Sequence, residues 1–525
     1  MTTLDWFVVF IYLAGMLWLA YRLGRVQVSR SDYYLGGQRL PSWALATSIV
    51  ATQCSTNSLL GAPAFVGFVA AGGMLWLQYE LAVPLAMLAL CFLIIPVHRS
   101  GVISIYAYLE KRLGLASRLL ASACFLFFRG VATGVTVYGV ASVIGLVTGI
   151  SFTWSVVMLM GITIAYDTLG GMRAVVISDV LQMALLLTAV AAGLWWLADP
   201  MIEHAGHLNT RSHTLVNDMG LGSGSDYGFW PMLIGGFFLY TAYYGCDQSQ
   251  AQRLLAARDA DQAQHILLLN GVLRFPLVFA YCLIGLGLAA YAIDNADFIG
   301  SLPLTEQGTP NYNLVFPAFV AREFAPGLAG LVIVGLFAAA MSSIDSALNS
   351  LSASTVEDFV ARFGQHSESR LFLYSKIATL LWGCFAVAFS FQVERIAPTV
   401  IEAINKVGSM ANGPLLALFT IAILCPRLGQ AAAITGFCAG LLANVFVWLL
   451  LPQVSWLWWN PFGFLLAWSI ALAVGLLLGR RLRFDALDLQ VPRTRKIVLL
   501  GMAGVIVLVC LALQWSANYN NLSVA

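Results

Sequence analysis

Residues 51–58 of the chain read Ala-Thr-Gln-Cys-Ser-Thr-Asn-Ser, and they lie in the middle of a mainly apolar run that covers residues 43–71. Polar groups are costly in hydrocarbon, and a run this dense cannot face protein all around one continuous helix. We therefore expect the helix to break near the bilayer midplane, where unwound backbone exposes carbonyl oxygens that can ligate a small cation. The alternative interpretation is a Ser/Thr-rich helix that packs against its neighbours.

The rest of the chain has the composition of a membrane protein. Of its 525 residues, 60% are hydrophobic and only 10% are charged, whereas a soluble domain carries about 25% charged residues. The mean hydropathy of +0.83 places most of the chain in lipid. A net charge of +2 is too small to indicate a nucleic-acid partner. The nine cysteines form no CxxC pair or Cys/His cluster, so we expect neither a disulfide framework nor a zinc site.

The sequence contains about fourteen apolar runs of the length that crosses roughly 30 Å of hydrocarbon. They cover residues 4–22, 43–71, 75–97, 117–147, 152–170, 174–197, 230–248, 264–293, 315–352, 370–393, 397–424, 428–452, 459–479 and 496–515. This pattern predicts an all-α membrane protein.

The basic residues concentrate in the loops that follow odd-numbered spans. After the first span come Arg22, Arg25, Arg30 and Arg39, and the loop after the thirteenth is also rich in arginine. Loops after even-numbered spans hold few basic residues and several acids. The positive-inside rule therefore predicts that the odd loops are cytoplasmic and that both termini lie outside. We expect a multi-pass protein of the bacterial cytoplasmic membrane.

A second polar group lies in the ninth predicted span. Its members Ser342, Asp345, Ser346 and Asn349 recur at i, i+3, i+4 and i+7, which is one helical face. Hydroxyl, carboxylate and carbonyl oxygens are hard ligands that suit an alkali cation. Serine hydroxyls that bond back to their own helix are the alternative explanation.

Two further pairs of charges fall inside predicted spans. Asp179 lies about one turn into the sixth span and could pair with Arg129 of the fourth, a contact that could be purely structural. Glu402 and Lys406 in the eleventh span are four residues apart and could simply neutralise each other.

Several short motifs occur in a fixed order between residue 33 and about residue 425. They are DYYLGG at 32–37, GG at 170–171, SDVLQ at 178–182, DQ at 247–248, QRLLAAR at 252–258, SS at 342–343, LNS at 348–350 and GPLL at 413–416. In this order they resemble the sodium:solute symporter family, which includes sodium/sugar, proline, sialic acid, iodide and monocarboxylate cotransporters.

The resemblance implies a ten-helix core of two inverted five-helix repeats, here spans 2–6 and 7–11, in which the first helix of each repeat is broken. The chain then divides into an N-terminal helix and loop (1–42), the transport core (43–425) and three C-terminal helices (426–525). The implied function is sodium-coupled import of a small polar organic solute by alternating access.

The resemblance also implies two cation sites. The main sodium ligands would be the backbone carbonyls of Ala51, Cys54 and Ala339 and the hydroxyls of Ser342 and Ser343. Some members bind a second sodium through Ser342, the positions 345 and 346, and an aspartate that matches Asp179. Here these positions are Asp345 and Ser346, so the nature of a second cation site is open.

Positions that resemble sugar contacts are Ser58, Glu80, Tyr240, Arg274 and Asn405, and Tyr243 resembles an inner gate. The segment LGAP at 60–63 looks more like the branch that carries monocarboxylates, vitamins and inorganic anions.

Arg274 lies ten residues into an apolar run, so its charge needs compensation. It could bind a negatively charged solute, pair permanently with Glu80 or Asp247, or line the inner vestibule.

Two other classes of function are weighed against a symporter. A transporter-like sensor would work with a separate kinase, because no kinase follows the last span. A membrane-embedded enzyme is not expected, because all six histidines fall in loops or at span ends.

The predicted topology is testable with a reporter that functions only in the cytoplasm. Fused after Ala525 it should be inactive, and inserted near Arg483 it should be active. The opposite result would mean that the number of spans is wrong by one.

Overall fold

The computed structural model describes the backbone of residues 2–524 except residues 26, 28, 55, 71, 223–225, 306–307, 397–399, 481 and 486–490. The side chains of residues 57, 394–396, 400–407 and 519–524 also lie outside the description. Across the described residues the regular structure is helical, apart from one isolated bridge between Leu304 and Pro310. The predicted all-α class is confirmed.

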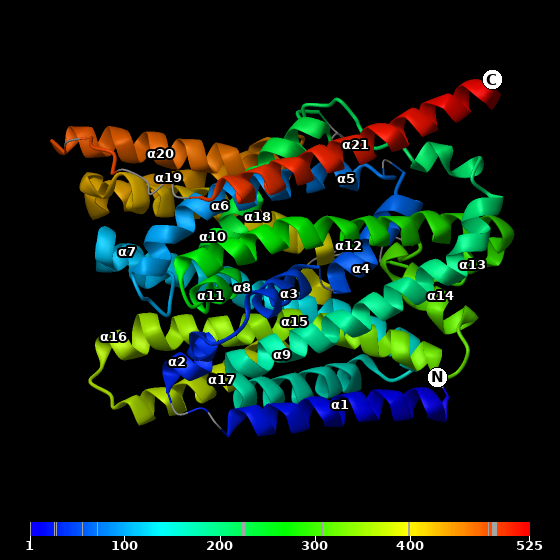
Figure 1. Ribbon diagram of the computed structural model, residues 1–525, viewed down its shortest axis with the longest axis horizontal. Coiled ribbons are helices and arrows are strands. Elements are labelled where there is room, and N and C mark those ends of the chain that lie inside the picture. The colour runs from blue at the N-terminus through cyan, green and yellow to red at the C-terminus, as the bar shows by residue number, and fades with distance from the viewer. Residues whose placement is uncertain are drawn as a thin grey trace.

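Ten helices in the described part of the chain are long and apolar enough to cross a membrane. They are α1 (Thr3–Gly24), α5 (Trp76–Glu80) with α6 (Ala82–Arg99), α8 (Leu115–Thr148), α9 (Phe152–Glu203), α12 (Ala260–Asp294), α15 (Leu328–Ser354) with its extension, α17 (Glu368–Ile396), α19 (Gly429–Leu450), α20 (Trp459–Leu477) and α21 (Arg493–Val524). The long helices run side by side along one direction, and both chain termini lie at the same end of the bundle (Figure 1). The chain is therefore a multi-pass membrane protein.

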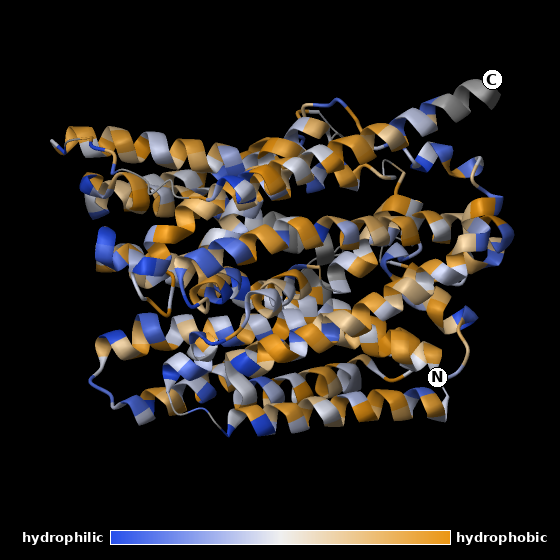
Figure 2. Ribbon diagram, viewed as in Figure 1, coloured by the Kyte–Doolittle hydropathy of each residue, from blue (hydrophilic) through white to orange (hydrophobic). Residues whose placement is uncertain are grey.

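The outer helices expose large hydrophobic side chains. On α1, Phe7, Phe10 and Trp18 are 60%, 70% and 61% exposed. Figure 2 shows that α1, α19 and α20 are mostly hydrophobic along their length. An apolar surface of this extent suits contact with lipid rather than water.

The predicted interruption of residues 43–71 is present. Helix α3 (Ser42–Gln53) ends before Cys54, which has φ −82° and ψ 52°, and α4 (Thr56–Phe68) begins two residues later. A similar break separates α10 (Gly236–Cys246) from α11 (Gln248–Leu255) at Asp247, which is extended. Its carboxylate accepts a hydrogen bond from Ser249 N and so caps α11.

Helix α9 changes direction at Gly171. A straight helix of 52 residues would be roughly 78 Å long, far more than one crossing needs. Gly171 has φ 53° and ψ −168°, and a Cβ there would lie 2.7 Å from the Tyr33 ring. Only glycine fits this conformation and space. The turn separates two segments that correspond to the predicted spans 152–170 and 174–197.

The predicted single span 315–352 is wrong. The structure has α14 (Val315–Glu323) and α15 as separate helices, because Pro326 and Gly327 interrupt the run. Asp5 of α1 caps the new start of α15, since its Oδ1 accepts hydrogen bonds from Gly327 N at 2.7 Å and Gly330 N at 2.8 Å.

The remaining α-helices are four short ones and α18, which has 25 residues. They are α2 (Arg30–Leu35), α7 (Tyr106–Arg112), α13 (Ala296–Gly300), α16 (Ala361–Phe363) and α18 (Val400–Leu424).

Candidate functional site

A cavity of about 420 Å³ lies beside the interruption between α3 and α4. Its walls come from α3, α4, α8, α10, α12 and α15. The polar residues that line it include Thr52, Gln53, Ser58, Arg129, Thr133, Thr136, Tyr240, Tyr243, Arg274, Tyr281 and Ser343. Four of the predicted solute or gate residues are thus on its wall: Ser58, Tyr240, Tyr243 and Arg274. The side chain of Asn405 lies outside the described residues.

Arg274 forms a buried ion pair with Glu80. Its Nε lies 2.6 Å from Oε2 and its Nη2 lies 2.8 Å from Oε1 of that carboxylate, whose side chain is fully buried. Tyr240 and Tyr244 add hydroxyl oxygens at 2.6 Å and 3.4 Å from the guanidinium. This is the internal pair that was one alternative for Arg274. The pair is neutral, and most of the guanidinium donors are already used.

Arg129 pairs with Asp247, at 3.1 Å between Nη2 and Oδ2, so the predicted pair between Arg129 and Asp179 is wrong. Asp247 stands at the break between α10 and α11, which turns its carboxylate toward α8. Arg129 also donates to Ser249 Oγ and stacks on the Tyr243 ring, 5.5 Å from the ring centre. Its Nε is buried and has no hydrogen-bond partner among the described residues. This arginine therefore keeps an unused donor while it lines the cavity.

Asp179 pairs instead with Arg253, at 3.3 Å between Oδ2 and Nη2. Arg253 also contacts Ser48, at 2.5 Å, and the Ser346 hydroxyl. This arginine was not predicted as a partner from the sequence, because α11 folds back into the protein and buries Arg253 completely. The flanking glutamines of the QRLLAAR motif were a weak signal of this position.

The oxygens expected to bind sodium meet where α15 crosses the end of α3. Ser342 Oγ lies 3.1 Å from both Ala51 O and Ala339 O, and it donates its proton to these carbonyls. Ser343 Oγ donates to Thr52 O at 2.9 Å. The Cys54 carbonyl accepts a hydrogen bond from Tyr281 OH at 3.0 Å instead. Two segments almost 300 residues apart in sequence thus present hydroxyl and carbonyl oxygens to each other.

Two predicted residues of a second cation site lie next to this cluster. Asp345 is fully buried; its Oδ1 accepts from Ser346 Oγ at 3.2 Å, and its Oδ2 has no partner in the described part of the chain. Ser346 Oγ lies 3.0 Å from Thr52 Oγ1, a residue that the sequence analysis did not assign. The third, Asp179, contacts this group through the guanidinium of Arg253.

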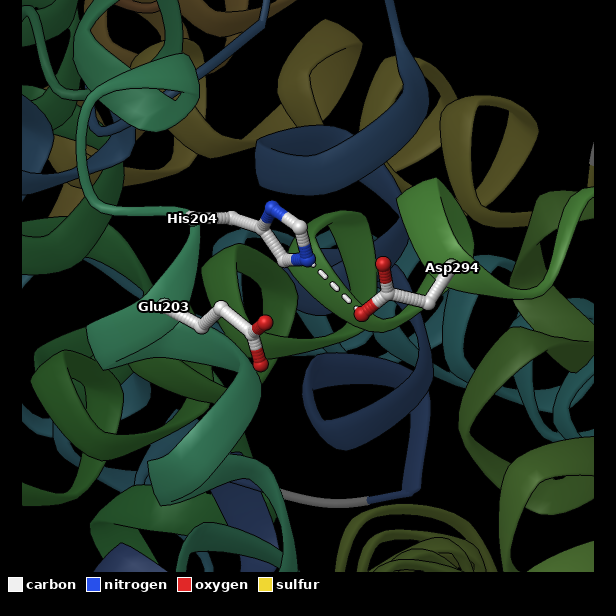
Figure 3. A group of neighbouring side chains, drawn as sticks. All are labelled: Glu203, His204 and Asp294. Atoms are coloured by element: carbon white, nitrogen blue, oxygen red, sulfur yellow. Dashed lines mark hydrogen bonds and ion pairs between the residues drawn. The ribbon is translucent and has the colours of Figure 1, made fainter.

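One group with potential metal ligands lies away from the cavity, where α9 and α12 end (Figure 3). Glu203, His204 and Asp294 place their ligand atoms within 4.8 Å of one another. His204 Nε2 and Asp294 Oδ2 are 2.7 Å apart and satisfy each other, so this contact ties the two helices together without a metal.

Comparison with known proteins places these features in one family. The sodium:solute symporter family matches residues 33–440. Sodium-coupled monocarboxylate transporter 1 of Xenopus laevis is 27% identical over 441 residues, which are 81% of this chain and 68% of that protein. The sodium/iodide cotransporter of Homo sapiens is 28% identical over 442 residues, covering 82% and 67% of the two chains.

A solved structure has a similar fold. It is a Na+-coupled sialic acid symporter in a substrate-bound outward-open state, with a TM-score of 0.80 and 23% identity over 93% of this chain and 100% of that one. At this identity the likeness supports the fold alone.

The ion pair of Glu80 with Arg274 should be structural, which a double-variant comparison tests. Glu80→Gln and Arg274→Gln should each lower the free energy of unfolding by about 3–5 kcal/mol, because either change leaves a buried charge unpaired. The double variant should recover most of that loss, as measured by thermal unfolding in detergent. Breaking the half-exposed pair of Arg112 with Asp485 is the control and should cost about 0–1 kcal/mol. Two single variants as stable as the parent would contradict the structural role.

Proposed function

Because this chain belongs to the sodium:solute symporter family, we propose that it couples the entry of sodium to the import of a small organic carboxylate. The chain is a sodium-coupled solute symporter and not an enzyme, as its family and its transporter relatives indicate. Neither of the relatives named above is a sensor. Import, alternating access and the carboxylate class are the parts that we add.

We infer fourteen spans, of which the ten core spans form two inverted five-helix repeats within residues 43–425. The ten membrane-length helices support this count, together with the broken pair α3–α4, the turn in α9, and the helices α10 and α18. The breaks at Cys54 and Asp247 fall in the first span of each proposed repeat. Residues 1–42 and 426–525 would then flank the core.

We also propose the bacterial cytoplasmic membrane as the location, with both termini outside. The termini and α13 lie at one end of the bundle, and α2, α7 and α16 lie toward the other (Figure 1). The arginine-rich loops accompany α2 and α7, so the positive-inside rule assigns that end to the cytoplasm.

The proposed sodium position lies between α3 and α15. Ser342 Oγ already lies 3.1 Å from Ala51 O and 3.1 Å from Ala339 O. Sodium would bind these oxygens, with Ser343 Oγ and Cys54 O as further ligands, in place of the hydrogen bonds that they now make. Unwound backbone at a broken helix is a common source of such ligands in transporters.

In this arrangement the proposed sodium position borders the cavity. Ser343 belongs to the proposed sodium ligands and also lines the cavity, as does Thr52 beside it. A cation that draws α15 toward α3 would therefore set the shape of the cavity wall. Each ligand must then strengthen the binding of the other by the same factor, because coupling between sites is reciprocal.

A second cation position remains part of the proposal in a modified form. Arg253 already neutralises Asp179, which leaves Asp345 and Ser346 as the groups for that cation. The unpartnered Oδ2 of Asp345 supports this assignment.

One observation carries the carboxylate class: Arg129 lines the cavity, and its buried Nε has no hydrogen-bond partner among the described residues. A guanidinium holds a carboxylate through directed, charge-assisted hydrogen bonds. Arg274 is committed to Glu80, so Arg129 replaces it as the proposed anion ligand. The relatives named for monocarboxylates and iodide also transport anions.

The sodium position is tested with two serine variants. Ser342→Ala and Ser343→Ala should each raise the sodium concentration for half-maximal uptake by about 10–100-fold, since the loss of one ligand costs about 1.4–2.8 kcal/mol. Uptake into proteoliposomes measures this. Ser350→Ala is the control, because among the described residues that buried hydroxyl bonds only to Ala347 O of its own helix. Unchanged sodium activation in both test variants would exclude the site.

The solute class is tested by binding at saturating sodium. Propionate, pyruvate and lactate should bind, whereas glucose and inositol should not. Arg129→Lys should weaken binding modestly, and Arg129→Gln should weaken it about 10–100-fold, because a hydrogen bond to a charged group is worth about 1.5–3 kcal/mol. Adding Asp247→Asn to Arg129→Gln removes the carboxylate that would be left unpaired. A loss of solute binding in this double variant is then not due to an unpaired charge that destabilises the fold. Tight binding of a neutral solute, with an affinity that neither Arg129 variant changes, would exclude the carboxylate assignment.

A further inference from the structure

Asp167 is a fully buried carboxylate that the proposed transport mechanism does not use. It lies on α9 four residues before the turn at Gly171, and both of its carboxylate oxygens are buried without a hydrogen-bond partner in the described part of the chain. Its main-chain carbonyl accepts a hydrogen bond from Tyr33 OH at 3.3 Å. The carboxylate itself has only the neutral amide of Asn349 acting on it as a hydrogen-bonding side chain among the described residues. An unpaired buried carboxylate costs several kcal/mol, so it requires compensation.

The groups around Asp167 do not supply the missing charge. Tyr33 of α2 and Tyr166 of α9 face it as neutral side chains. Within the part of the chain that the structure describes, Arg253 of α11 is the cation that acts on it, and that guanidinium already pairs with Asp179. Asp345 of α15 adds a further negative charge. Three buried carboxylates therefore share one guanidinium among the described residues. If a cation at Asp345 supplies one positive charge, one more is still needed.

Asn349 of α15 is the polar side chain beside Asp167. Its Oδ1 accepts from Gln252 Nε2 at 2.9 Å, and its Nδ2 is buried without a partner in the described residues. The side-chain oxygen of Gln252 is also buried and unpartnered. Amide and carboxylate oxygens in one dry place are hard ligands for an alkali cation.

The position continues the polar face of α15. Ser342, Asp345 and Asn349 follow one another along this helix, and a rise of 1.5 Å per residue puts Asn349 about 10 Å beyond Ser342. The face runs from the proposed sodium cluster toward α2, whose buried Tyr34 accepts from Gln252 through its main-chain oxygen at 2.7 Å. That end of the bundle is the proposed cytoplasmic one.

We propose that Asp167 and Asn349 form an additional sodium position at the α2 end of the polar face of α15. It rests on the proposed function, because it lies on the route by which sodium would leave the main cluster. The carboxylate supplies the negative charge. Asn349 Oδ1 now accepts from Gln252 Nε2, and it would have to turn toward the cation, as would Gln252 Oε1, to act as a neutral ligand. Its sodium balances the carboxylate that Arg253 leaves uncompensated.

The test counts the sodium ions that the purified protein binds. At saturating 22Na+, Asp167→Asn should bind one ion fewer per protein than the parent chain. Asn349→Ala keeps the carboxylate, so it should bind as many sodium ions as the parent, but half-saturation should need about tenfold more sodium. This variant replaces Asp167→Asn as the test if Asp167→Asn does not fold. Asp358→Asn is the matched control, because that buried carboxylate already has Arg118, Ser104 and Ser122 as partners; its sodium count should not change.

An Asp167→Asn protein that binds as many sodium ions as the parent would overturn the proposal. The proposal is also overturned if Asp167→Asn changes only the number of protons that the protein binds, because a proton then neutralises Asp167 in the parent. A parent protein that binds no sodium would instead contradict the proposed function itself. The two failures are therefore distinguishable.

Discussion

Polar groups in the interior of this membrane protein must find partners within the protein, because hydrocarbon offers none. The constraint is most severe at the interruption of α3 and α4, where helical hydrogen bonding stops among apolar neighbours. The hydroxyls of Ser342 and Ser343 meet the last carbonyls of α3, and Tyr281 meets the Cys54 carbonyl. The partners of the broken helix therefore bring α12 and α15 to the cavity, and the same oxygens are those best suited to a small cation.

The buried arginines are subject to the same constraint, but they differ in how many of their hydrogen-bond donors have partners. Most of the donors of Arg274 are engaged by Glu80 and two tyrosines, so it contributes order to the cavity wall rather than a free positive charge. Arg129 is paired by Asp247, but it lines the cavity and retains a buried donor without a partner among the described residues. Arg253 balances one of three neighbouring aspartates. An arginine whose donors are mostly bonded within the protein therefore has a structural role. An arginine with an unpartnered donor can still bind a ligand.

Local patterns predicted much of the fold and part of the site. The polar run at 51–58 predicted the break in its helix, and the spacing of Ser342 with Asp345 predicted their shared face, because both signals lie within one segment. Partners across helices were not predictable in this way. Asp179 pairs with Arg253 rather than Arg129, since the inward fold of α11 has no periodic signature in the sequence. The span 315–352 was expected to be continuous, although Pro326 and Gly327 divide it.

The central claim is that sodium binds between the end of α3 and the middle of α15. Hydrogen–deuterium exchange of the purified protein, with sodium or with choline as the cation, tests it most directly. Sodium should slow exchange in peptides that cover residues 50–58 and 338–346 and leave those from α19 and α20 unchanged, because a bound ligand raises the free energy of local opening. Equal exchange of both core peptides in the two cations would contradict the account.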